Sequence, residues 1–252
     1  MSVANRVAIV TGASRGIGRA VALALARAGL DLFLVAEGTE DELKAACADC
    51  VSAGAKRAAY GVFDLSLPES ATRVAAAALE GHGRIDVLVN NAGIRIRHPF
   101  GEFTAAEFDS VVAVNLRAAF LLSQAVLPAM RAQKGGRIIH MASQLGLVAD
   151  PGSALYGITK AGLIHLTRSM AYELGPEGIL VHAVSPGPIL TEFYKGRLAR
   201  EPDLLQRRLA RSPVGRLGTP EEIAEVVAFL ATTGATFMTG GNVVVDGGYV
   251  TH

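Results

Sequence analysis

Short apolar segments that alternate with helical segments restrict the fold of this chain more than any other feature of its sequence. Continuous apolar runs, typical of strands covered on both faces, lie at 7–10, 32–35, 57–63, 87–90, 137–142, 179–184 and 242–246. Helical patterns lie between them, at about 16–28, 40–53, 68–82, 105–133, 153–175 and 219–233. This alternation predicts an α/β fold, in which a doubly wound, Rossmann-like sheet of seven parallel strands carries helices on both faces.

The length of the chain allows one core of this kind, so we expect a single domain over residues 1–252. Ligands of doubly wound sheets bind beyond the carboxyl ends of the strands. Several polar or turn-forming residues fall at or just past the end of a predicted strand, namely Gly12, Asp64, Asn90, Ser143 and Pro186. The segment 187–213, which we expect to be irregular, follows a strand at the same edge and is interpreted as a substrate lid.

A glycine-rich loop at 11–18 (TGASRGIG) joins the first predicted strand to the first predicted helix. Gly12 would permit a sharp turn, Gly16 a close approach of phosphate to the backbone, and Gly18 tight packing of helix on strand. The spacing differs from the commoner Gly-x-Gly-x-x-Gly, and taken alone it also fits an ordinary strand-to-helix turn. Its place after the first strand favours a dinucleotide-binding loop.

Tyr156 and Lys160 stand four residues apart in a predicted helix and therefore share one face. A cation held beside a phenol stabilises the phenolate and lowers the pKa of the phenol, which makes it a usable proton donor and acceptor. The spacing alone also fits an exposed lysine beside a half-buried tyrosine. The other motifs of the chain favour the catalytic interpretation.

With these motifs the chain resembles the short-chain dehydrogenase/reductase family over essentially its whole length. The matching motifs occur in the family's order: 11–18, Asn90-Asn91-Ala92-Gly93, Asn115, Ser143 with Tyr156 and Lys160, Pro186-Gly187, and Asp246-Gly247-Gly248. The resemblance implies an enzyme that interconverts a ketone and a secondary alcohol by hydride exchange with NAD or NADP.

The resemblance also assigns roles to four catalytic residues. Tyr156 would be the general acid/base, and Lys160 would lower its pKa and hold the nicotinamide ribose. Ser143 would donate a hydrogen bond to the substrate oxygen, and Asn115 would anchor a water that links Lys160 to solvent. A nucleotide-binding regulator without turnover is the alternative from another class, although such proteins usually lose Tyr or Lys from this set.

Cofactor contacts are implied along the same edge of the sheet. They involve Gly12, Ser14, Arg15, Gly16, Ile17, Gly18, Ala36, Thr39, Asp64, Leu65, Asn91, Ala92, Gly93, Tyr156, Lys160, Pro186, Gly187, Ile189 and Thr191. Ala36 stands where NAD-preferring relatives carry an acidic residue, while Arg15 and Thr39 suit the 2′-phosphate of NADP. Glu37 argues the other way, because a carboxylate beside a phosphate is unfavourable. We therefore expect NADP in preference to NAD.

The substrate is less constrained than the reaction. Residues 215–223 and the ending at 246–248 resemble the branch that contains 3-oxoacyl-carrier-protein reductases and many sugar, polyol and secondary-alcohol dehydrogenases. Arg95, Arg97 and His98 could meet an anionic substrate or carrier at the mouth of the cleft, or be solvated loop charges. By the same resemblance we expect a homotetramer or a homodimer.

Charge and composition give no reason to expect a nucleic-acid or membrane partner. The formal net charge is +1 and only 19% of the residues are charged. We find no apolar run of the length of a membrane span and no signal peptide, so a cytoplasmic protein is expected. Cys47 and Cys50 form a CxxC without a second pair of ligands at suitable spacing, and we therefore predict no metal site.

Overall fold

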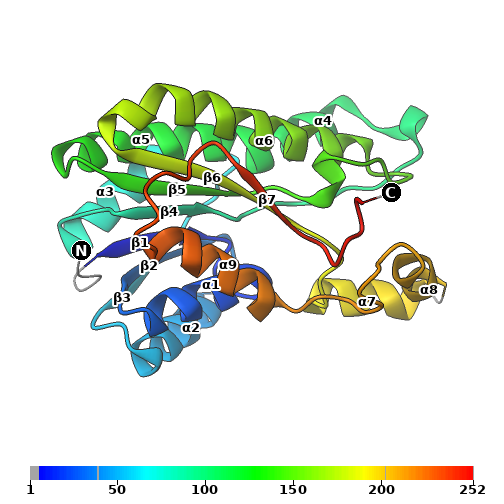
Figure 1. The fold of residues 1–252 in the computed structure, drawn as a ribbon, viewed down its shortest axis with the longest axis horizontal. Helices are drawn as coiled ribbons and strands as arrows, with labels where there is room; N and C mark the ends of the chain where they lie inside the picture. The colour runs from blue at the N-terminus through cyan, green and yellow to red at the C-terminus, as the bar shows by residue number, and fades with distance from the viewer. Residues whose placement is uncertain (1–5, 39, 202, 252) are drawn as a thin grey trace.

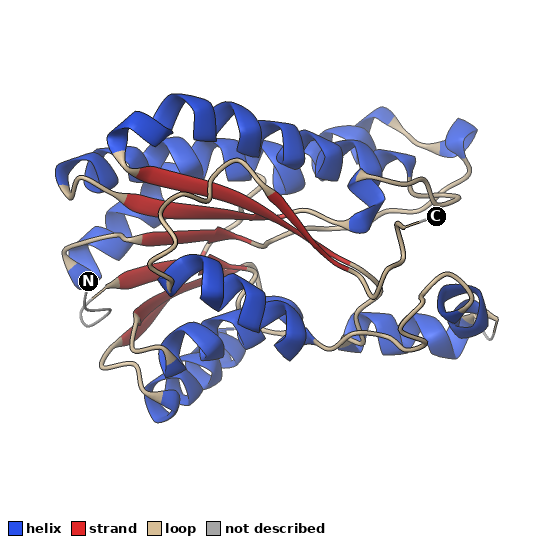
Figure 2. Ribbon diagram, in the orientation of Figure 1, coloured by secondary structure: helices blue, strands red, loops and turns tan. Residues whose placement is uncertain are grey.

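The computed structural model describes residues 6–38, 40–201 and 203–251, and its centre is a parallel sheet (Figures 1 and 2). The seven strands have the order β3-β2-β1-β4-β5-β6-β7, and every neighbouring pair is parallel. They are β1 (Val7–Thr11), β2 (Asp31–Ala36), β3 (Ala58–Val62), β4 (Val87–Asn90), β5 (Gly136–Met141), β6 (Ile179–Pro186) and β7 (Asn242–Val245). The predicted fold class is confirmed, and each strand lies within two residues of its expected bounds.

Helices cover both faces of the sheet in two layers (Figure 1). One layer contains α1 (Gly16–Arg27), α2 (Glu40–Ala53) and α9 (Pro220–Thr232). The other contains α3 (Ser70–His82), α4 (Ala105–Val112), α5 (Ala118–Ala132) and α6 (Ala154–Leu174). Successive strand residues enter opposite cores: Ala8 and Val10 pack in the first layer and Ile9 in the second. This two-sided burial explains why the strands read as continuous apolar runs.

The predicted long helix at 105–133 is present but contains a π-helical segment, η2 (Ala113–Arg117), between α4 and α5. Its start is fixed by a capping box, in which Thr104 Oγ1 accepts from Glu107 N and Glu107 accepts from Thr104 N. By length and composition alone, Ala105–Ala132 would be long and apolar enough to cross a membrane, which the sequence analysis did not anticipate. Here Leu122, Val126 and Met130 pack in the core between α5 and the sheet.

The prediction of an irregular segment at 187–213 is wrong, because most of it is helical. It forms α7 (Glu192–Arg200) and α8 (Leu204–Leu209), which lie beyond the carboxyl ends of the strands (Figure 1). Thr191 caps α7, since its Oγ1 accepts from the Tyr194 backbone N–H at 3.2 Å. The absence of a broad apolar face hid these helices: only Tyr194, Arg197, Leu204 and Arg208 are buried in them.

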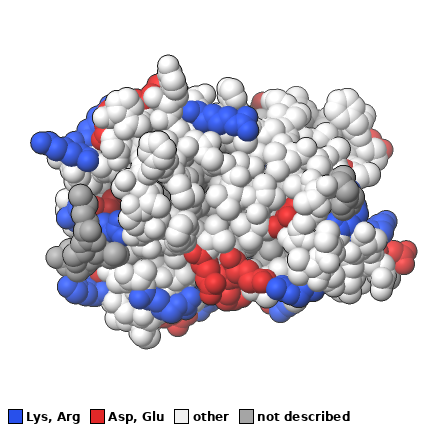
Figure 3. All heavy atoms as spheres, in the orientation of Figure 1, with Lys and Arg blue, Asp and Glu red and all other residues white. Residues whose placement is uncertain are grey.

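The chain also contains three short 3-10 helices, which are η1 (Phe100–Glu102), η3 (Gln144–Gly146) and η4 (Gly175–Glu177). Basic and acidic side chains are interspersed with wide uncharged areas on the face shown in Figure 3. This pattern agrees with the small net charge of the sequence. The parallel direction of the strands brings the loops after β1, β4, β5 and β6 to one edge, where the predicted functional residues lie.

Candidate active site

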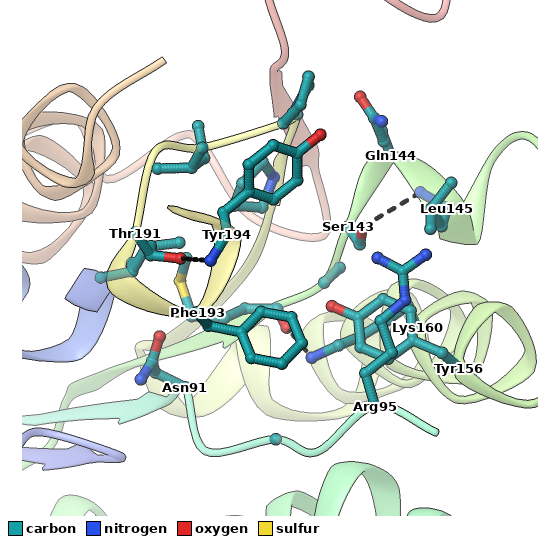
Figure 4. Close-up of a pocket in the computed structure, with 18 of the residues that line it drawn as sticks. Asn91, Arg95, Ser143, Gln144, Leu145, Tyr156, Lys160, Thr191, Phe193 and Tyr194 are labelled. Atoms are coloured by element: carbon teal, nitrogen blue, oxygen red, sulfur yellow. Dashed lines mark hydrogen bonds between the residues drawn. The ribbon is translucent and has the colours of Figure 1, made fainter. Parts of the chain in front are cut away.

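A cleft of about 500 Å³ opens at this edge, between the carboxyl ends of the strands and α7 (Figure 4). The predicted residues that line it are Arg15, Ile17, Asn91, Gly93, Ser143, Tyr156, Lys160, Pro186, Gly187, Ile189 and Thr191. In Figure 4, Asn91 and Thr191 lie at one end of the cleft, and Ser143, Tyr156 and Arg95 lie at the other. The parallel sheet therefore brings residues as far apart in the sequence as Arg15 and Arg208 into one site.

The glycine loop is held in place by the loop after β4. Asn91 Nδ2 donates to Thr11 O at 2.8 Å and to Gly12 O at 3.3 Å, while Thr11 Oγ1 accepts from Asn91 N at 2.9 Å. Gly12 has φ +64°, in the left-handed region that favours glycine. A Cβ on Gly18 would lie 2.1 Å from Gly12 O, so only glycine at position 18 allows the helix to pack this closely against the turn. The roles predicted for these two glycines follow from this geometry.

The start of α1 suits a pyrophosphate. Arg15 is the N-cap residue but its side chain makes no capping hydrogen bond, so the backbone N–H groups of the first turn have no side-chain acceptor. Gly16 has φ +57°, and a Cβ there would lie 3.6 Å from Thr191 Cγ2, at the wall of the cleft. Free N–H groups at the positive end of a helix beside a small residue are the features that hold a dinucleotide phosphate. The residues present therefore fit a nicotinamide dinucleotide.

Ser143, Tyr156 and Lys160 meet at the other end of the cleft. Ser143 follows β5, and its Oγ accepts from Leu145 N at 3.1 Å. Tyr156 and Lys160 lie on one face of α6, with Lys160 Nζ 5.5 Å from the centre of the Tyr156 ring. Lys160 is 3% exposed, and its ammonium donates to Met141 O at 2.6 Å. The three side chains that the sequence grouped are therefore neighbours in the fold.

The electrostatics of Tyr156 differ from the sequence prediction. Burial raises the pKa of Tyr156, and Arg95 and the Ser143 hydroxyl act against this by lowering it. Lys160, which was expected to lower the pKa of Tyr156, has its ammonium bonded to the Met141 carbonyl instead. Burial lowers the pKa of Lys160 itself to about 8. In this arrangement the cation that favours the phenolate is Arg95.

Arg95 belongs to the loop after β4 and is held by two residues that precede α6. Its Nη2 donates to Ser153 Oγ at 2.6 Å and to Asp150 Oδ2 at 3.3 Å, and its guanidinium lies 5.2 Å from the centre of the Tyr156 ring. The side chain is 17% exposed, so the interpretation of Arg95 as a solvated loop charge is wrong. His98 pairs instead with Glu107, at 2.8 Å.

Asn115 lies in the π-helical segment and is 1% exposed. Its Nδ2 donates to Ile94 O at 2.9 Å and to Thr159 Oγ1 at 3.2 Å, and its Oδ1 accepts from Ile94 N at 2.8 Å. It does not line the cleft but supports the loop after β4 from behind, since a Cβ on Gly93 would lie 3.3 Å from Asn115 Oδ1. Its proposed link to water stays a prediction.

Some predicted cofactor residues lie at the same edge without lining the cleft: Gly12, Ser14, Gly16, Gly18, Ala36, Asp64, Leu65 and Ala92. Leu65 is 7% exposed and packs in the core with α3 and α5, so its side chain is not available to an adenine. Asp64 accepts from Ser66 N at 2.8 Å, and the Ser66 hydroxyl, together with this backbone N–H, lowers the pKa of Asp64. Ala36 ends β2 without a carboxylate, and Thr39 lies outside the described residues.

Sequence analysis did not single out several residues that line the cleft, although three of them lie in the segment 187–213 that it predicted to be a lid. Gln144 and Leu145 follow Ser143 directly, Phe193 and Tyr194 come from α7, and Arg208 comes from α8. Thr191 is a capping residue directly before α7, and this sequence signal could have revealed the helix. No sequence signal marked Arg208, because its partners lie far away in the chain.

The paired cysteines are structural. Cys47 and Cys50 are free and buried against α1, and burial raises the pKa of their thiols to about 11 and about 12. Within the described residues no group of His, Cys, Asp and Glu is arranged to hold a metal ion.

The site combines an uncapped helix start after a glycine turn with a Ser, Tyr and Lys set at the same edge of the sheet. These features together define the class of Rossmann-like oxidoreductases that use a nicotinamide dinucleotide. Comparison with known proteins narrows the class to a family. The family profile described as Enoyl-(Acyl carrier protein) reductase matches residues 12–250. The chain belongs to the short-chain dehydrogenase/reductase family and is an NAD(P)-dependent enzyme, which confirms the resemblance and sets aside a non-catalytic regulator.

Known relatives match over almost the full length of the chain. The 3-oxoacyl-acyl-carrier-protein reductase FabG of Vibrio cholerae is 39% identical over 248 residues, which are 98% of each chain. Oxidoreductase UcpA of Escherichia coli strain K12 is 36% identical over 97% of this chain and 94% of its own. A candidate NAD(P) dependent gluconate 5-dehydrogenase from Beutenbergia cavernae, solved with bound NADP, has a TM-score of 0.92 and 37% identity, covering 100% of this chain and 99% of its own.

Proposed function

We propose that this enzyme interconverts a ketone and a secondary alcohol, with Tyr156 as the general acid/base. The observation that carries the proposal is the position of Tyr156: it lines the cleft with Ser143 and Lys160, in the same cavity as the uncapped start of α1. The substrate belongs to the 3-oxoacyl thioesters or to the sugars, polyols and secondary alcohols.

The residues have distinct parts in this reaction. When bound, the nicotinamide supplies or accepts the hydride at the substrate carbon. In the direction of reduction, Tyr156 Oη donates its proton to the substrate oxygen, and in oxidation it takes that proton back. Ser143 Oγ donates a hydrogen bond to the same oxygen and stabilises the developing alkoxide. Lys160, buried beside Gly93, would hold the nicotinamide ribose when the cofactor is bound.

We propose NADP as the preferred cofactor. Ala36 brings no carboxylate to the end of β2, and Arg15 lines the cleft at the start of α1. The candidate gluconate 5-dehydrogenase and a candidate 2-deoxy-D-gluconate 3-dehydrogenase from Agrobacterium tumefaciens were both solved with NADP. Glu37, just after β2, argues for NAD. The ratio of kcat/KM for NADPH and NADH tests this preference, and a larger value for NADH would overturn it.

We further propose a homotetramer or homodimer that works in the cytoplasm, as a single domain whose α7–α8 segment at 187–213 covers the substrate. An apolar hollow of about 400 Å³ between α4 and α6 supports association. Phe100 and Ile158 line it and are 83% and 56% exposed. Light scattering of the purified protein decides between monomer and oligomer.

A cofactor-oxidation screen tests the reaction itself. The purified enzyme is mixed with NADPH and a panel of 3-oxoacyl thioesters, ketoses, keto acids and aryl ketones, and the absorbance of NADPH is followed. We expect turnover with at least one carbonyl class. Absence of turnover with every class, in both directions and with both cofactors, would refute the proposed reaction.

A further inference from the structure

We infer that Arg95 and Arg208 form a subsite for a carboxylate, so that the substrate is a small keto acid or hydroxy acid. The inference rests on the proposed ketone–alcohol reaction and names the substrate class of that site. Both side chains line the cleft, one from the loop after β4 and the other from α8. The comparisons name relatives with several substrate classes, so they do not decide this point.

Positive charge exceeds negative charge around this end of the cleft. Asp150 accepts from three arginines: Arg95 at 3.3 Å, Arg97 at 3.3 Å and Arg208 at 2.8 Å. The Asp150 and Arg208 side chains are only 9% and 8% exposed, and Arg95 is 17% exposed. Three cations around one carboxylate leave positive charge without compensation in a region that water reaches poorly.

The carboxylate of Glu201 also acts on Arg97 but does not correct this imbalance. Glu201 pairs with Arg197 at 2.6 Å and with Arg207 at 3.4 Å, so it is already shared between two further cations. Burial and the neighbouring Arg97 lower the pKa of Arg95, and burial and Arg197 lower that of Arg97. Burial is the larger cause in both, and repulsion among the guanidinium groups adds to it, whereas Asp150 raises the pKa of Arg208 against the effect of burial. An anion bound in the cleft would relieve this repulsion.

The position of Arg95 limits the size of the acid. Its guanidinium lies 5.2 Å from the centre of the Tyr156 ring, and Tyr156 Oη is the proposed proton donor to the carbonyl. An anionic group that contacts Arg95 must therefore lie within a few bonds of the reacting carbon. A 3-oxoacyl thioester carries its charge on the distant carrier and is neutral near the carbonyl. The geometry favours a small carboxylic acid over such a thioester.

Unpartnered polar atoms around the same space fit a substrate that also carries hydroxyl groups. Among the described residues, Gln144 Oε1 and Arg95 Nε are buried without a hydrogen-bond partner, and the buried Tyr194 hydroxyl lies near Arg208. Gln144 and Tyr194 line the cleft and are 5% and 8% exposed. Buried polar atoms in native proteins nearly always have a partner, so these atoms are suited to a polar ligand. A polyhydroxy acid would satisfy both the amide oxygen and the arginines.

Matched substrate pairs test the inference on the native enzyme. L-Sorbose differs from 5-keto-D-gluconate, and D-fructose from 2-keto-D-gluconate, only in a hydroxymethyl group that replaces the carboxylate. Acetoacetyl-coenzyme A represents the thioesters. We expect kcat/KM with NADPH to be at least about tenfold higher for one keto acid than for its ketose and for the thioester, the factor that a charge-assisted hydrogen bond supplies. Equal values within both pairs would overturn the inference.

Variants show whether the two arginines cause this selectivity. Arg95→Gln and Arg208→Gln should each lower the acid-to-ketose ratio of kcat/KM by about tenfold or more. A ratio is measured because it cancels a general loss of activity or of folded protein. Arg207→Gln is the matched control, since Arg207 adjoins Arg208 but its side chain is 63% exposed and pairs with Glu201. An unchanged ratio in both Arg95→Gln and Arg208→Gln would contradict the inference.

Binding separates this inference from the proposed reaction. If no carbonyl is turned over, the proposed reaction is refuted. Calorimetric titration of the NADP-loaded protein with gluconate and with sorbitol then tests whether the carboxylate subsite exists, independently of turnover. We expect gluconate to bind at least about tenfold more tightly than sorbitol, and Arg95→Gln to abolish the difference. Equal affinity for the acid and the polyol in the native protein would refute the subsite.

Discussion

At the scale of single residues, Tyr156 carries the proposed chemistry. Replacing it with phenylalanine removes the proton donor but keeps the ring that packs between Arg95 and Lys160. We expect Tyr156→Phe to lower kcat by about 100- to 10,000-fold. Cofactor affinity, measured by fluorescence titration with NADPH, should be nearly unchanged. Tyr172→Phe is the control, because Tyr172 lies on the same helix and is 89% exposed. Appreciable turnover by Tyr156→Phe would contradict the assignment.

The pH dependence of reduction reports on the charge beside Tyr156. Reduction needs the protonated phenol, so its rate falls as the pH rises through the pKa of Tyr156. Burial raises that pKa, and Arg95 lowers it. Arg95→Gln removes the lowering effect, so the alkaline limb of kcat for a neutral ketone should move to higher pH. A limb that stays in place or moves to lower pH would show that Arg95 does not act on the phenol.

The residues of the site differ in how well the sequence predicts them. Tyr156 and Lys160 are predictable because both their spacing and their helix are local properties. The partners of Arg95 were not predictable, since Asp150 and Ser153 lie 55 and 58 positions away. The same holds for the ammonium of Lys160, whose bond to the Met141 carbonyl depends on how β5 and α6 pack. Pairings between distant segments are set by tertiary structure.

At the scale of elements, the turn between β1 and α1 is the least tolerant part of the fold. Gly18→Ala would place a Cβ 2.1 Å from Gly12 O, which requires the helix or the turn to move. We expect a lower melting temperature and at least about a tenfold weaker affinity for NADPH, since the phosphate-binding N–H groups move with it. Thermal melting and fluorescence titration measure both.

A glycine elsewhere provides the control for this prediction. Gly81 lies inside α3, where a Cβ would meet nothing within 4 Å. Gly81→Ala should stabilise the protein by up to about 1 kcal/mol through helix propensity, and leave NADPH affinity unchanged. If Gly18→Ala behaved like Gly81→Ala, the close packing of α1 on the turn would have no functional importance.

Elements with local end signals were predicted well, and those without them were not. The capping box at Thr219 and Glu222 begins α9 where it was expected, with Pro220 as the first helical residue. The helices α7 and α8 were missed because arginines supply much of their buried surface, and arginine is not an apolar signal. The π-helical turn around Asn115 has no sequence signature, since its hydrogen bonds reach Ile94 and Thr159.

At the scale of the whole molecule, the substrate end of the cleft is built from three distant parts of the chain. Asp150 comes from the loop between β5 and α6, Arg208 from α8, and Tyr249 from the C-terminal segment. Arg208 Nη1 donates to Tyr249 Oη at 2.6 Å, and the Tyr249 ring is fully buried. These contacts fasten α8 to the body of the protein. The carboxylate subsite and the position of the proposed lid therefore depend on the same ion cluster.

A buried histidine at the centre of the sheet couples the stability of the fold to pH. His140 lies in β5, is 0% exposed, and has its Nδ1 3.2 Å from Asn90 Nδ2, which donates to it in the neutral ring. Burial, reinforced by Lys160, lowers the pKa of His140 to about 3. The ordinary value is 6.5, so between these two values the unfolded chain binds a proton that the folded protein does not. Stability is therefore lost as the pH falls below 6.5.

The size of this effect makes it measurable. Between pH 7 and pH 5, His140 should lower the free energy of unfolding by roughly 2 kcal/mol. His140→Gln, which cannot be protonated, should be less stable at pH 7 but lose less stability on acidification, as measured by urea unfolding at both pH values. His165→Gln on the exposed side of α6 is the control and should lose as much as the native protein. If protonation of His140 causes the loss of stability in acid, replacing His140 must reduce that loss. An equal loss in His140→Gln would therefore mean that other groups, such as the buried His182, dominate the acid sensitivity.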